Sequence, residues 1–139
     1  MRIALYEPDI PQNTGTILRL AACLGLAVDI IEPAGFPVTD RAFRRAGMDY
    51  LHRVSITRHG SFKDFEEWRR REGHKLVLLT TAAECSYLDH AFAADQILLF
   101  GRESAGVPQA VRSSSSSSRA RSRQPVEVAP SAPRRRTAS

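Results

Sequence analysis

Two kinds of apolar pattern alternate along residues 1–111 of the chain. Short continuous apolar runs are typical of strands that are buried on both faces of a parallel sheet. Segments between them repeat apolar residues three or four positions apart, which is typical of helices packed on such a sheet. The alternation predicts an α/β fold with a mostly parallel sheet and flanking helices. The predicted strands are Arg2–Tyr6, Leu26–Ile31, Val54–Thr57, Lys75–Thr80 and Gln96–Phe100.

The segment Glu7–Arg19, a loop followed by the first part of the helix predicted over residues 14–24, forms the first candidate site. Two prolines make this loop stiff, and Asn13 or Thr14 is expected to cap the helix. Gly15 lets another molecule approach the backbone closely, and Arg19 follows about one turn later. An anion bound here would meet backbone N–H groups and a guanidinium together. The alternative is an ordinary strand-to-helix corner with a surface arginine.

Two shorter helices are predicted further along the chain. Gly25 is expected to end the first helix, and Thr39 or Asp40 to begin a second one that closes at Ala46 and Gly47. A third helix is expected to begin after Ser61, with Asp64 in a capping-box position. Three aromatic residues of this helix share one face and are predicted to belong to the core rather than to a base-stacking surface. They are Phe62, Phe65 and Trp68. Cys23 is also expected to be buried.

Two segments that directly follow predicted central strands are further candidate sites. Ligands of parallel sheets bind beyond the carboxyl ends of the strands, which directs attention to Thr80 and Thr81 and to residues 101–106. Neither GxGxxG nor GxxxxGK[ST] occurs in the chain, so a generic nucleotide-binding domain ranks last among the functions considered.

The composition changes at residue 112, where a run of six serines begins at Ser113 and a segment rich in Arg, Ser and Pro follows. Such a segment cannot bury enough apolar surface to fold, so residues 112–139 are predicted to be disordered and residues 1–111 to form one domain. Two origins are considered for this tail. It is either a basic arm for RNA or an out-of-frame, artefactual end.

The net charge of +5 comes from this tail. Residues 1–111 contain 13 Lys and Arg against 14 Asp and Glu, whereas residues 112–139 contain seven Arg and one Glu. The two cysteines and four histidines have no metal-ligand spacing, and no apolar run reaches the length of a membrane span. We therefore expect a soluble, cytoplasmic protein with no metal and no membrane partner.

Two motifs that lie far apart in the chain resemble the motifs of a known protein family. The first is Pro8-Asp9-Ile10-Pro11-Gln12-Asn13-Thr14-Gly15 with Arg19, and the second is the segment from Leu98 to Pro108, which contains Phe-Gly-Arg-Glu-Ser-Ala-Gly. Arg44-Arg45-Ala46-Gly47-Met48-Asp49-Tyr50 is a supporting match. Together they resemble the SPOUT RNA 2′-O-methyltransferases, and within them the small tRNA wobble-position enzymes.

The resemblance covers residues 1 to about 111 and implies a trefoil-knotted α/β domain. It implies a homodimer that transfers a methyl group from S-adenosylmethionine to the ribose of C34 or U34 in the tRNA anticodon stem-loop. Arg19 is implied as the catalytic arginine, with Asn13 helping to position it. Because a guanidinium stays protonated in proteins, positioning and electrostatic stabilisation are the expected roles of Arg19.

The resemblance also implies that Leu79 and Gly101 contact S-adenosylmethionine, with Thr80 and Glu103 nearby. Glu103 is expected to stabilise the sulfonium, to pair with an arginine or to be a solvated loop carboxylate, and Leu79 to contact the cofactor or only the core. A helix-borne cluster, Arg41, Arg44 and Arg45, is expected either to bind tRNA phosphates or to form a solvated helix face.

One part of the family pattern is not found in this sequence. A third motif, with an Ile-Pro-Met strand end and a last helix, follows the second motif in the family, where it completes the knot, the cofactor site and the dimer interface. The Ser/Arg/Pro tail occupies its place. Weak cofactor binding, weak methyl transfer and a doubtful dimer are therefore expected. The alternative function is a non-enzymatic RNA-binding protein that uses the α/β part and the basic tail.

Overall fold

A parallel sheet forms the centre of the structure, a computed structural model that describes residues 1–45, 49–81, 83, 85–115 and 119–121. In these residues the strand order is β3-β2-β1-β6-β4-β7-β5, and every neighbouring pair is parallel. The strands are β1 (Arg2–Tyr6), β2 (Ala27–Ile31), β3 (Ile56–His59), β4 (Lys75–Thr80), β5 (Cys85–Ser86), β6 (Gln96–Phe100) and β7 (Arg119–Arg121). The helices are α1 (Pro11–Leu24), α2 (Asp40–Arg45), the 3-10 helix η1 (Asp49–Arg53), α3 (Phe62–Arg71) and α4 (Gln109–Ser114).

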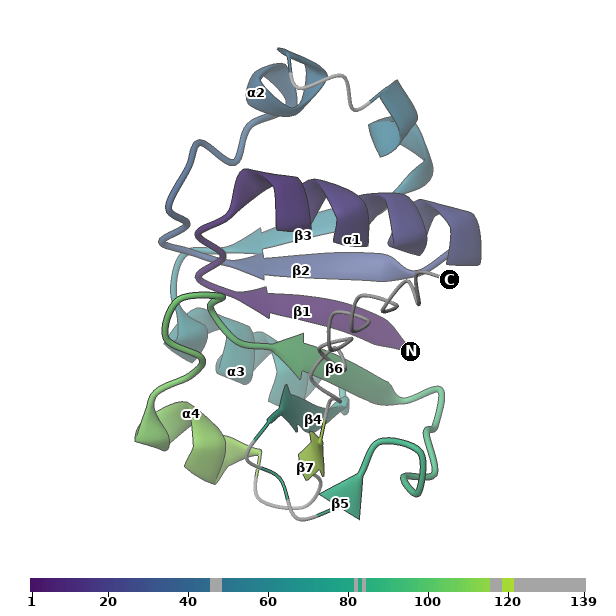
Figure 1. The fold of residues 1–139 in the computed structure, drawn as a ribbon, viewed down its shortest axis with the longest axis vertical. Helices are drawn as coiled ribbons and strands as arrows, with labels where there is room; N and C mark the ends of the chain where they lie inside the picture. Colours follow the sequence, from purple (N-terminus) through teal and green to yellow (C-terminus); the bar gives the residue numbers. More distant parts are fainter. Residues whose placement is uncertain (46–48, 82, 84, 116–118, 122–139) are drawn as a thin grey trace, which may run out of the picture.

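The predicted α/β class is confirmed, and so are four of its strands. β1, β4 and β6 have the predicted bounds, and β2 begins one residue late (Figure 1). The third strand was predicted two residues too early, because Val54 looked like a strand position. Val54 instead follows η1 and is buried in the core below α1.

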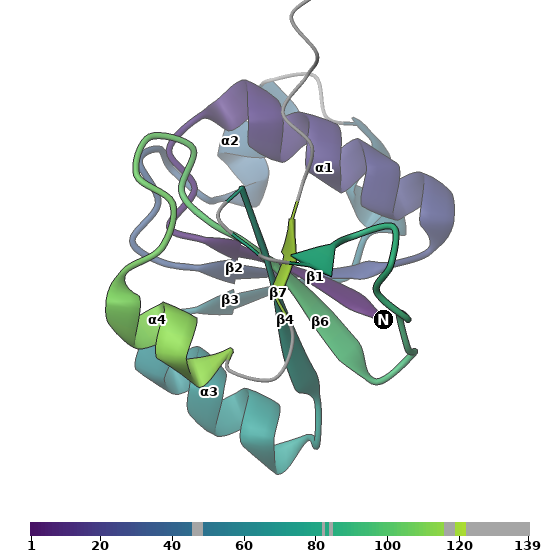
Figure 2. The same cartoon turned by 60° about the horizontal axis from the view of Figure 1, so that its bottom comes forward.

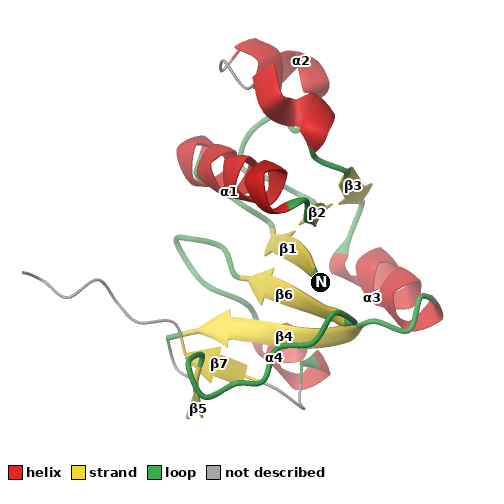
Figure 3. Cartoon of the chain, turned by 90° about the vertical axis from the view of Figure 1, so that its right-hand side faces the viewer, coloured by secondary structure: helices red, strands yellow, loops and turns green. Residues whose placement is uncertain are grey.

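Helices cover both faces of the sheet. α1 and α3 lie on opposite sides when the sheet is viewed edge-on (Figure 3), and α4 lies beside α3 (Figure 2). One core cluster joins the sheet to α1, α2 and η1 through residues such as Leu18 and Phe43. The second joins it to α3 and α4 through residues such as Phe65 and Val111. Each strand of the centre is therefore buried on both faces, as its apolar run predicted.

α1 begins three residues earlier than predicted, and neither Asn13 nor Thr14 is its N-cap. Ile10 is the N-cap and Pro11 is the first helical residue. Proline suits that position because its missing N–H would have no acceptor in the helix. Thr14 is fully buried within the first turns. The predicted C-cap is confirmed, since Gly25 has φ 65° and donates its N–H to the Ala21 carbonyl.

Cys23 is exposed, which corrects the prediction that it is buried. Leu18 and Ala21 are fully buried on the sheet side of α1. A step of two positions rotates a side chain by about 200° around the helix axis, so Cys23 faces solvent. The position of Cys23 around the helix axis, and not its apolar neighbours in the sequence, determines that it is exposed.

Two predicted caps are confirmed at the shorter helices. The Thr39 hydroxyl accepts the Ala42 N–H at 3.1 Å, and the Ser61 hydroxyl accepts the Asp64 N–H at 3.1 Å. The predicted end of α2 at residues 46 and 47 lies outside the described residues. The core role of the three aromatic residues of α3 is confirmed, because Phe65 is fully buried and its two neighbours pack against the same cluster.

Two elements extend past the predicted domain boundary at residue 111. α4 continues to Ser114, and β7 pairs with β4 and β5. The prediction of disorder from residue 112 is therefore wrong for residues 112–115 and 119–121. A strand of three residues pairs through main-chain groups and does not need the large apolar side chains that the tail lacks. Residues 122–139 lie outside the described residues.

A buried carboxylate ties the three strands on one side of the sheet together. Asp29 of β2 is fully buried and accepts from Arg2 of β1 at 2.8 and 3.0 Å. Its Oδ1 also lies 2.9 Å from Nε2 of His59 on β3. The Arg2 guanidinium stacks over the Trp68 ring of α3, 5.0 Å from its centroid. This network fixes β1 against β2 and β3, and so fixes the strand from which the first motif emerges.

The Asp29→Asn variant is expected to lower the free energy of unfolding by about 3 kcal/mol, because it leaves the Arg2 charge without its partner in a buried setting. Urea denaturation at neutral pH measures this change. Asp95→Asn is the matched control, since Asp95 pairs with Lys75 at the exposed surface and its loss should have little effect. Equal losses in the two variants would contradict a stabilising role for the buried network.

Candidate functional site

The chain makes a tight turn as it leaves β1. Glu7 has a positive φ of 41° and donates its N–H to the Ile31 carbonyl at 2.9 Å. The next residues pack against the loop that follows β2, where Gly35 donates its N–H to the Pro8 carbonyl at 2.8 Å. A Cβ at Gly35 would lie 3.0 Å from the Cα of Asp9. The loop between β1 and α1 is therefore held from the β2 side by close backbone contact.

A set of hydrogen bonds joins this loop to the loop after β6, and we call it the loop clamp. Its members are Glu7, Asp9, Arg102, Glu103 and Ser104. Arg102 Nε donates to the Glu7 carbonyl at 3.2 Å, and its guanidinium pairs with the Glu7 carboxylate. Glu103 Oε2 accepts the Asp9 N–H at 3.0 Å, and the Ser104 hydroxyl donates to the Asp9 carboxylate. The two sequence motifs are thus joined directly in space.

The loop after β6 folds back on itself through its glycines. Arg102 and Gly106 exchange two main-chain hydrogen bonds, of 2.9 and 2.7 Å. Gly106 has φ 65°, and a Cβ at Gly101 would lie 2.8 Å from the Gly106 carbonyl carbon. No side chain fits at position 101 without moving the backbone of the loop.

A cavity of about 360 Å³ lies between this loop, the end of β4 and α4. It is lined by Leu78, Leu79, Thr80, Thr81, Phe100, Gly101, Arg102, Glu103, Gly106, Val107 and Arg112. All four residues that were expected to contact a cofactor, Leu79, Thr80, Gly101 and Glu103, share this cavity. The structure brings them together because the carboxyl ends of the neighbouring strands β4 and β6 meet at one edge of the sheet.

Two arginines of this cavity were given no role from the sequence. Arg102 lies in the candidate segment 101–106, and its position directly after the motif glycine could have singled it out. Arg112 lines the cavity from α4 and donates from Nε to the Val107 carbonyl at 3.3 Å. No sequence pattern pointed to Arg112, because the helix that carries it, α4, was not predicted.

Asn13 and Arg19 do not line the cavity. Both are exposed on α1, whose first residue follows the clamped loop. The Arg19 guanidinium lies over the ring of Tyr50, 5.4 Å from its centroid. The structure therefore presents these two side chains on a helix whose start is fixed by the loop clamp.

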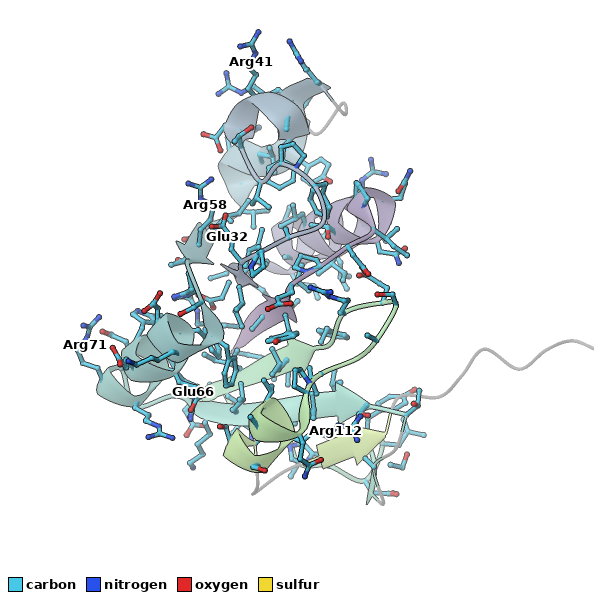
Figure 4. The ribbon with its side chains drawn as sticks, turned by 90° about the vertical axis from the view of Figure 1, so that its left-hand side faces the viewer. Glu32, Arg41, Arg58, Glu66, Arg71 and Arg112 are labelled. Carbon is cyan, nitrogen blue, oxygen red and sulfur yellow. The ribbon has the colours of Figure 1, made fainter. Side chains whose placement is uncertain are left out.

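The helix-borne arginines Arg41, Arg44 and Arg45 lie apart from the cavity. They line open depressions at the end of the molecule formed by α2. Figure 4 shows Arg41 pointing away from the body of the protein at this end and Arg112 near the opposite end. The structure does not gather all predicted site residues into one pocket.

The carboxylate of Asp9 has an altered acidity in the loop clamp. Its side-chain hydrogen bonds, first with Glu103 and then with Ser104, lower the pKa of Asp9 below its usual value. Its Oδ1 is buried without a hydrogen-bond partner among the described residues. The clamp is therefore built around a charged Asp9.

The described residues contain no group of three or more His, Cys, Asp or Glu side chains that could hold a metal ion. None of the helices in this part of the chain is long and apolar enough to cross a membrane.

A family model matches residues 1–120, and its description is the SpoU rRNA methylase family. This chain belongs to that family. The match includes both motifs, the loop clamp and all residues of the cavity. It confirms the resemblance stated from the motifs, and the shared chemistry of this methylase family is methyl transfer to RNA.

Two curated tRNA methyltransferases are similar to this chain over most of its length. A tRNA (cytidine(34)-2′-O)-methyltransferase of Ancylobacter novellus is 61% identical over 114 residues, which are 82% of this chain and 72% of the relative. The enzyme of the same name from Escherichia coli K12 is 39% identical over 111 residues, which are 80% of this chain and 69% of the relative.

Solved structures agree with this family membership. One, from work on 2-OH methylation of C/U34 on tRNA, has a TM-score of 0.78 and 35% identity and covers 89% of this chain and 80% of its own. An AdoMet-bound rRNA methyltransferase from Sinorhizobium meliloti has a TM-score of 0.74 and 27% identity, covering 92% of this chain and 49% of its own. The predicted SPOUT-type α/β fold is thereby confirmed.

The stabilising effect of the Asp9 charge is expected to depend on pH. A carboxyl group whose pKa is lowered by folding stabilises the fold above its unfolded pKa, and this effect is lost as the pH falls through the lower folded value. The difference in unfolding free energy between the native chain and Asp9→Asn should therefore be largest at neutral pH and shrink below about pH 4. Urea denaturation between pH 3 and pH 7, on the order of one pH unit apart, measures it.

Asp89→Asn is the control for this experiment, because Asp89 is exposed and lies outside the loop clamp. The effect of Asp89→Asn on the free energy of unfolding should not shrink in the same way as the pH falls. A difference for Asp9→Asn that stays constant through the acid range would show that its charge does not hold the clamp.

Proposed function

We propose that this chain transfers a methyl group from S-adenosylmethionine to the ribose 2′-hydroxyl of C34 or U34 in a tRNA anticodon stem-loop. The loop clamp carries the proposal, because it joins a cofactor-sized cavity to the start of the helix that presents Arg19. The relatives' names, which specify cytidine 34, and the structure from work on C/U34 support the choice of nucleotide.

The cavity is suited to S-adenosylmethionine. Its volume is within the usual range for small-molecule sites, and apolar side chains such as Leu79 and Val107 supply surface for an adenosyl group. Gly101 lets that group reach main-chain amide and carbonyl groups, and Thr80 lines the same cavity. When bound, S-adenosylmethionine supplies the methyl group on a cationic sulfonium. The AdoMet-bound relative from S. meliloti supports this assignment.

Glu103 has two tasks in this proposal. Its Oε2 holds the Asp9 N–H, and its side chain also lines the cavity, where a carboxylate favours a cationic ligand. It does not pair with Arg102, whose carboxylate partner is Glu7. We therefore assign Glu103 to the wall of the cofactor site and to the position of the first loop, rather than to a purely solvated role.

Arg19 is assigned to the RNA. A ribose hydroxyl is a poor nucleophile, so it must be held in line with the methyl group while its proton leaves. Arg19 stays protonated and is suited to bind the phosphate or ribose of the target nucleotide and to stabilise negative charge that develops on the 2′-oxygen. Asn13, exposed one turn and a half earlier on α1, is assigned to helping to position Arg19.

A second RNA contact is assigned to the α2 cluster of Arg41, Arg44 and Arg45. All three side chains are exposed, Arg41 projects from this end of the molecule (Figure 4), and the cluster is suited to phosphates of the stem. Their distance from the cavity favours a role in binding the RNA rather than in the reaction. A homodimer and a cytoplasmic location stay predictions.

The first test concerns the cofactor. Calorimetric titration of the purified chain with S-adenosylmethionine should give one saturable site, and Gly101→Ala should weaken it about tenfold, because the new Cβ meets the Gly106 backbone. Gly60→Ala is the control, since the nearest atom to its Cβ is a movable Asp64 carboxylate oxygen. Equal affinities of Gly101→Ala and the native chain for S-adenosylmethionine would show that the cofactor does not bind in this cavity.

The second test concerns the RNA. Arg19→Ala should lower the rate of methyl transfer from labelled cofactor to tRNA by about 100-fold or more, as for other losses of a transition-state cation. Arg19→Lys should recover part of the rate, because lysine keeps the charge but not the planar fork. Digestion to oligonucleotides followed by mass spectrometry should place the methyl group on the ribose of nucleotide 34.

Arg71→Ala is the matched control, because Arg71 points away from the protein on α3 (Figure 4). Its rate should equal that of the native chain. If the native chain binds tRNA but transfers no methyl group to it, the non-enzymatic RNA-binding function replaces this proposal.

A further inference from the structure

The partner of the Arg19 guanidinium differs from the carboxylate partners of three arginines near the sheet. Arg2, Arg69 and Arg102 each pair with a carboxylate. Among the described residues, the Arg19 guanidinium instead meets the face of an aromatic ring, that of Tyr50, at 5.4 Å. Its position over the ring gives a favourable cation–π contact without a counter-charge.

The Tyr50 ring is itself fixed to α1. Its hydroxyl donates to the Gly15 carbonyl at 2.7 Å, and its ring packs against the core cluster below α1. Residue 15 lies four positions before residue 19, so the hydroxyl binds the helical turn that carries Arg19. A carbonyl oxygen has two lone pairs and can accept this bond in addition to the helical one. Tyr50 therefore contacts both the backbone and the side chain of the same turn.

This arrangement suits an arginine that has to bind an anion. An exposed arginine side chain has many rotamers, and ordering it on binding costs conformational entropy. The Tyr50 ring restricts the guanidinium in advance. Because a ring face accepts no strong hydrogen bond, the N–H donors and the net charge of Arg19 stay available for phosphate or ribose oxygens. A carboxylate partner would have accepted hydrogen bonds from the N–H donors of Arg19 and neutralised its charge.

We infer that Tyr50 is a positioning residue that orders Arg19 for the RNA, an inference that rests on the proposed function of Arg19. Tyr50 acts through Arg19 and has no direct contact with the reacting atoms. Its sequence position, in the Arg-Arg-Ala-Gly-Met-Asp-Tyr segment, places it on η1, which packs against α1.

The position of the guanidinium can be measured without any enzymatic activity. In a nitrogen-15 NMR spectrum, the Arg19 Nε–Hε signal should carry the ring-current shift of Tyr50. Tyr50→Leu should move this signal to the ordinary arginine position, whereas Tyr50→Phe should leave it close to the native one. Leu51→Ala is the control, because Leu51 packs against the same core cluster from η1. It should lower stability without moving the signal.

A double-mutant cycle then tests the functional role. Tyr50→Leu should slow methyl transfer about fivefold, as expected for the loss of one cation–π contact, and Tyr50→Phe about twofold or less. In the Arg19→Ala background, Tyr50→Leu should have no further effect on the rate or on tRNA affinity, whereas a purely structural role would lower both in either background. Circular dichroism and thermal unfolding establish that each variant is folded.

The outcomes separate this inference from the proposed function. An Arg19 signal that does not respond to Tyr50→Leu, or equal effects of Tyr50→Leu with and without Arg19, would overturn the inference. A native chain that transfers no methyl group would instead overturn the proposed function, and the NMR result and the tRNA-affinity cycle would still decide whether Tyr50 orders Arg19. A shifted signal that relaxes in Tyr50→Leu, together with a non-additive cycle, supports the inference.

Discussion

Hydrogen bonds between the loop after β1 and the loop after β6 join residues that lie about 95 positions apart in the chain. Each loop has constraints of its own, prolines in the first and the Arg102–Gly106 hydrogen bonds in the second, and the clamp fixes the two loops relative to each other. On one side the clamp sets where α1 begins, and with it the direction of Arg19. On the other side it sets the wall of the cavity. A small number of polar contacts therefore fixes the position of Arg19 and α1 relative to the wall of the cavity.

The sheet makes these contacts possible. β1 pairs directly with β6 in parallel, with Leu5 opposite Phe100, so the two chains leave the sheet at the same edge. Glycines then allow the backbones to approach, at Gly101 against Gly106 and at Gly35 against Asp9. Polar side chains in the clamp satisfy main-chain groups that would otherwise be stranded between two loops. Close backbone packing brings the two loops together, and the polar contacts of the loop clamp fix their relative orientation.

The parts of the structure that the sequence predicted are those with strong local signals. The apolar runs of β4 and β6 had no competing interpretation, and the residues at their carboxyl ends were brought together in the cavity as parallel pairing requires. α4 and β7 were not predicted, because their stability comes from packing on α3 and from main-chain pairing rather than from local composition. The link between Arg19 and Tyr50 joins two helices, and no local pattern records such a contact.

The pairing of β1 has a consequence for the order in which the protein can form. β1 and β2 are neighbours in the chain as well as in the sheet, so this half can assemble early during synthesis. The other partner of β1 is β6, which is made almost a hundred residues later. Contacts between distant segments close large loops and form slowly. A nascent chain that has β1, α1 and Arg19 therefore has no site until β6 has been made and has joined the sheet.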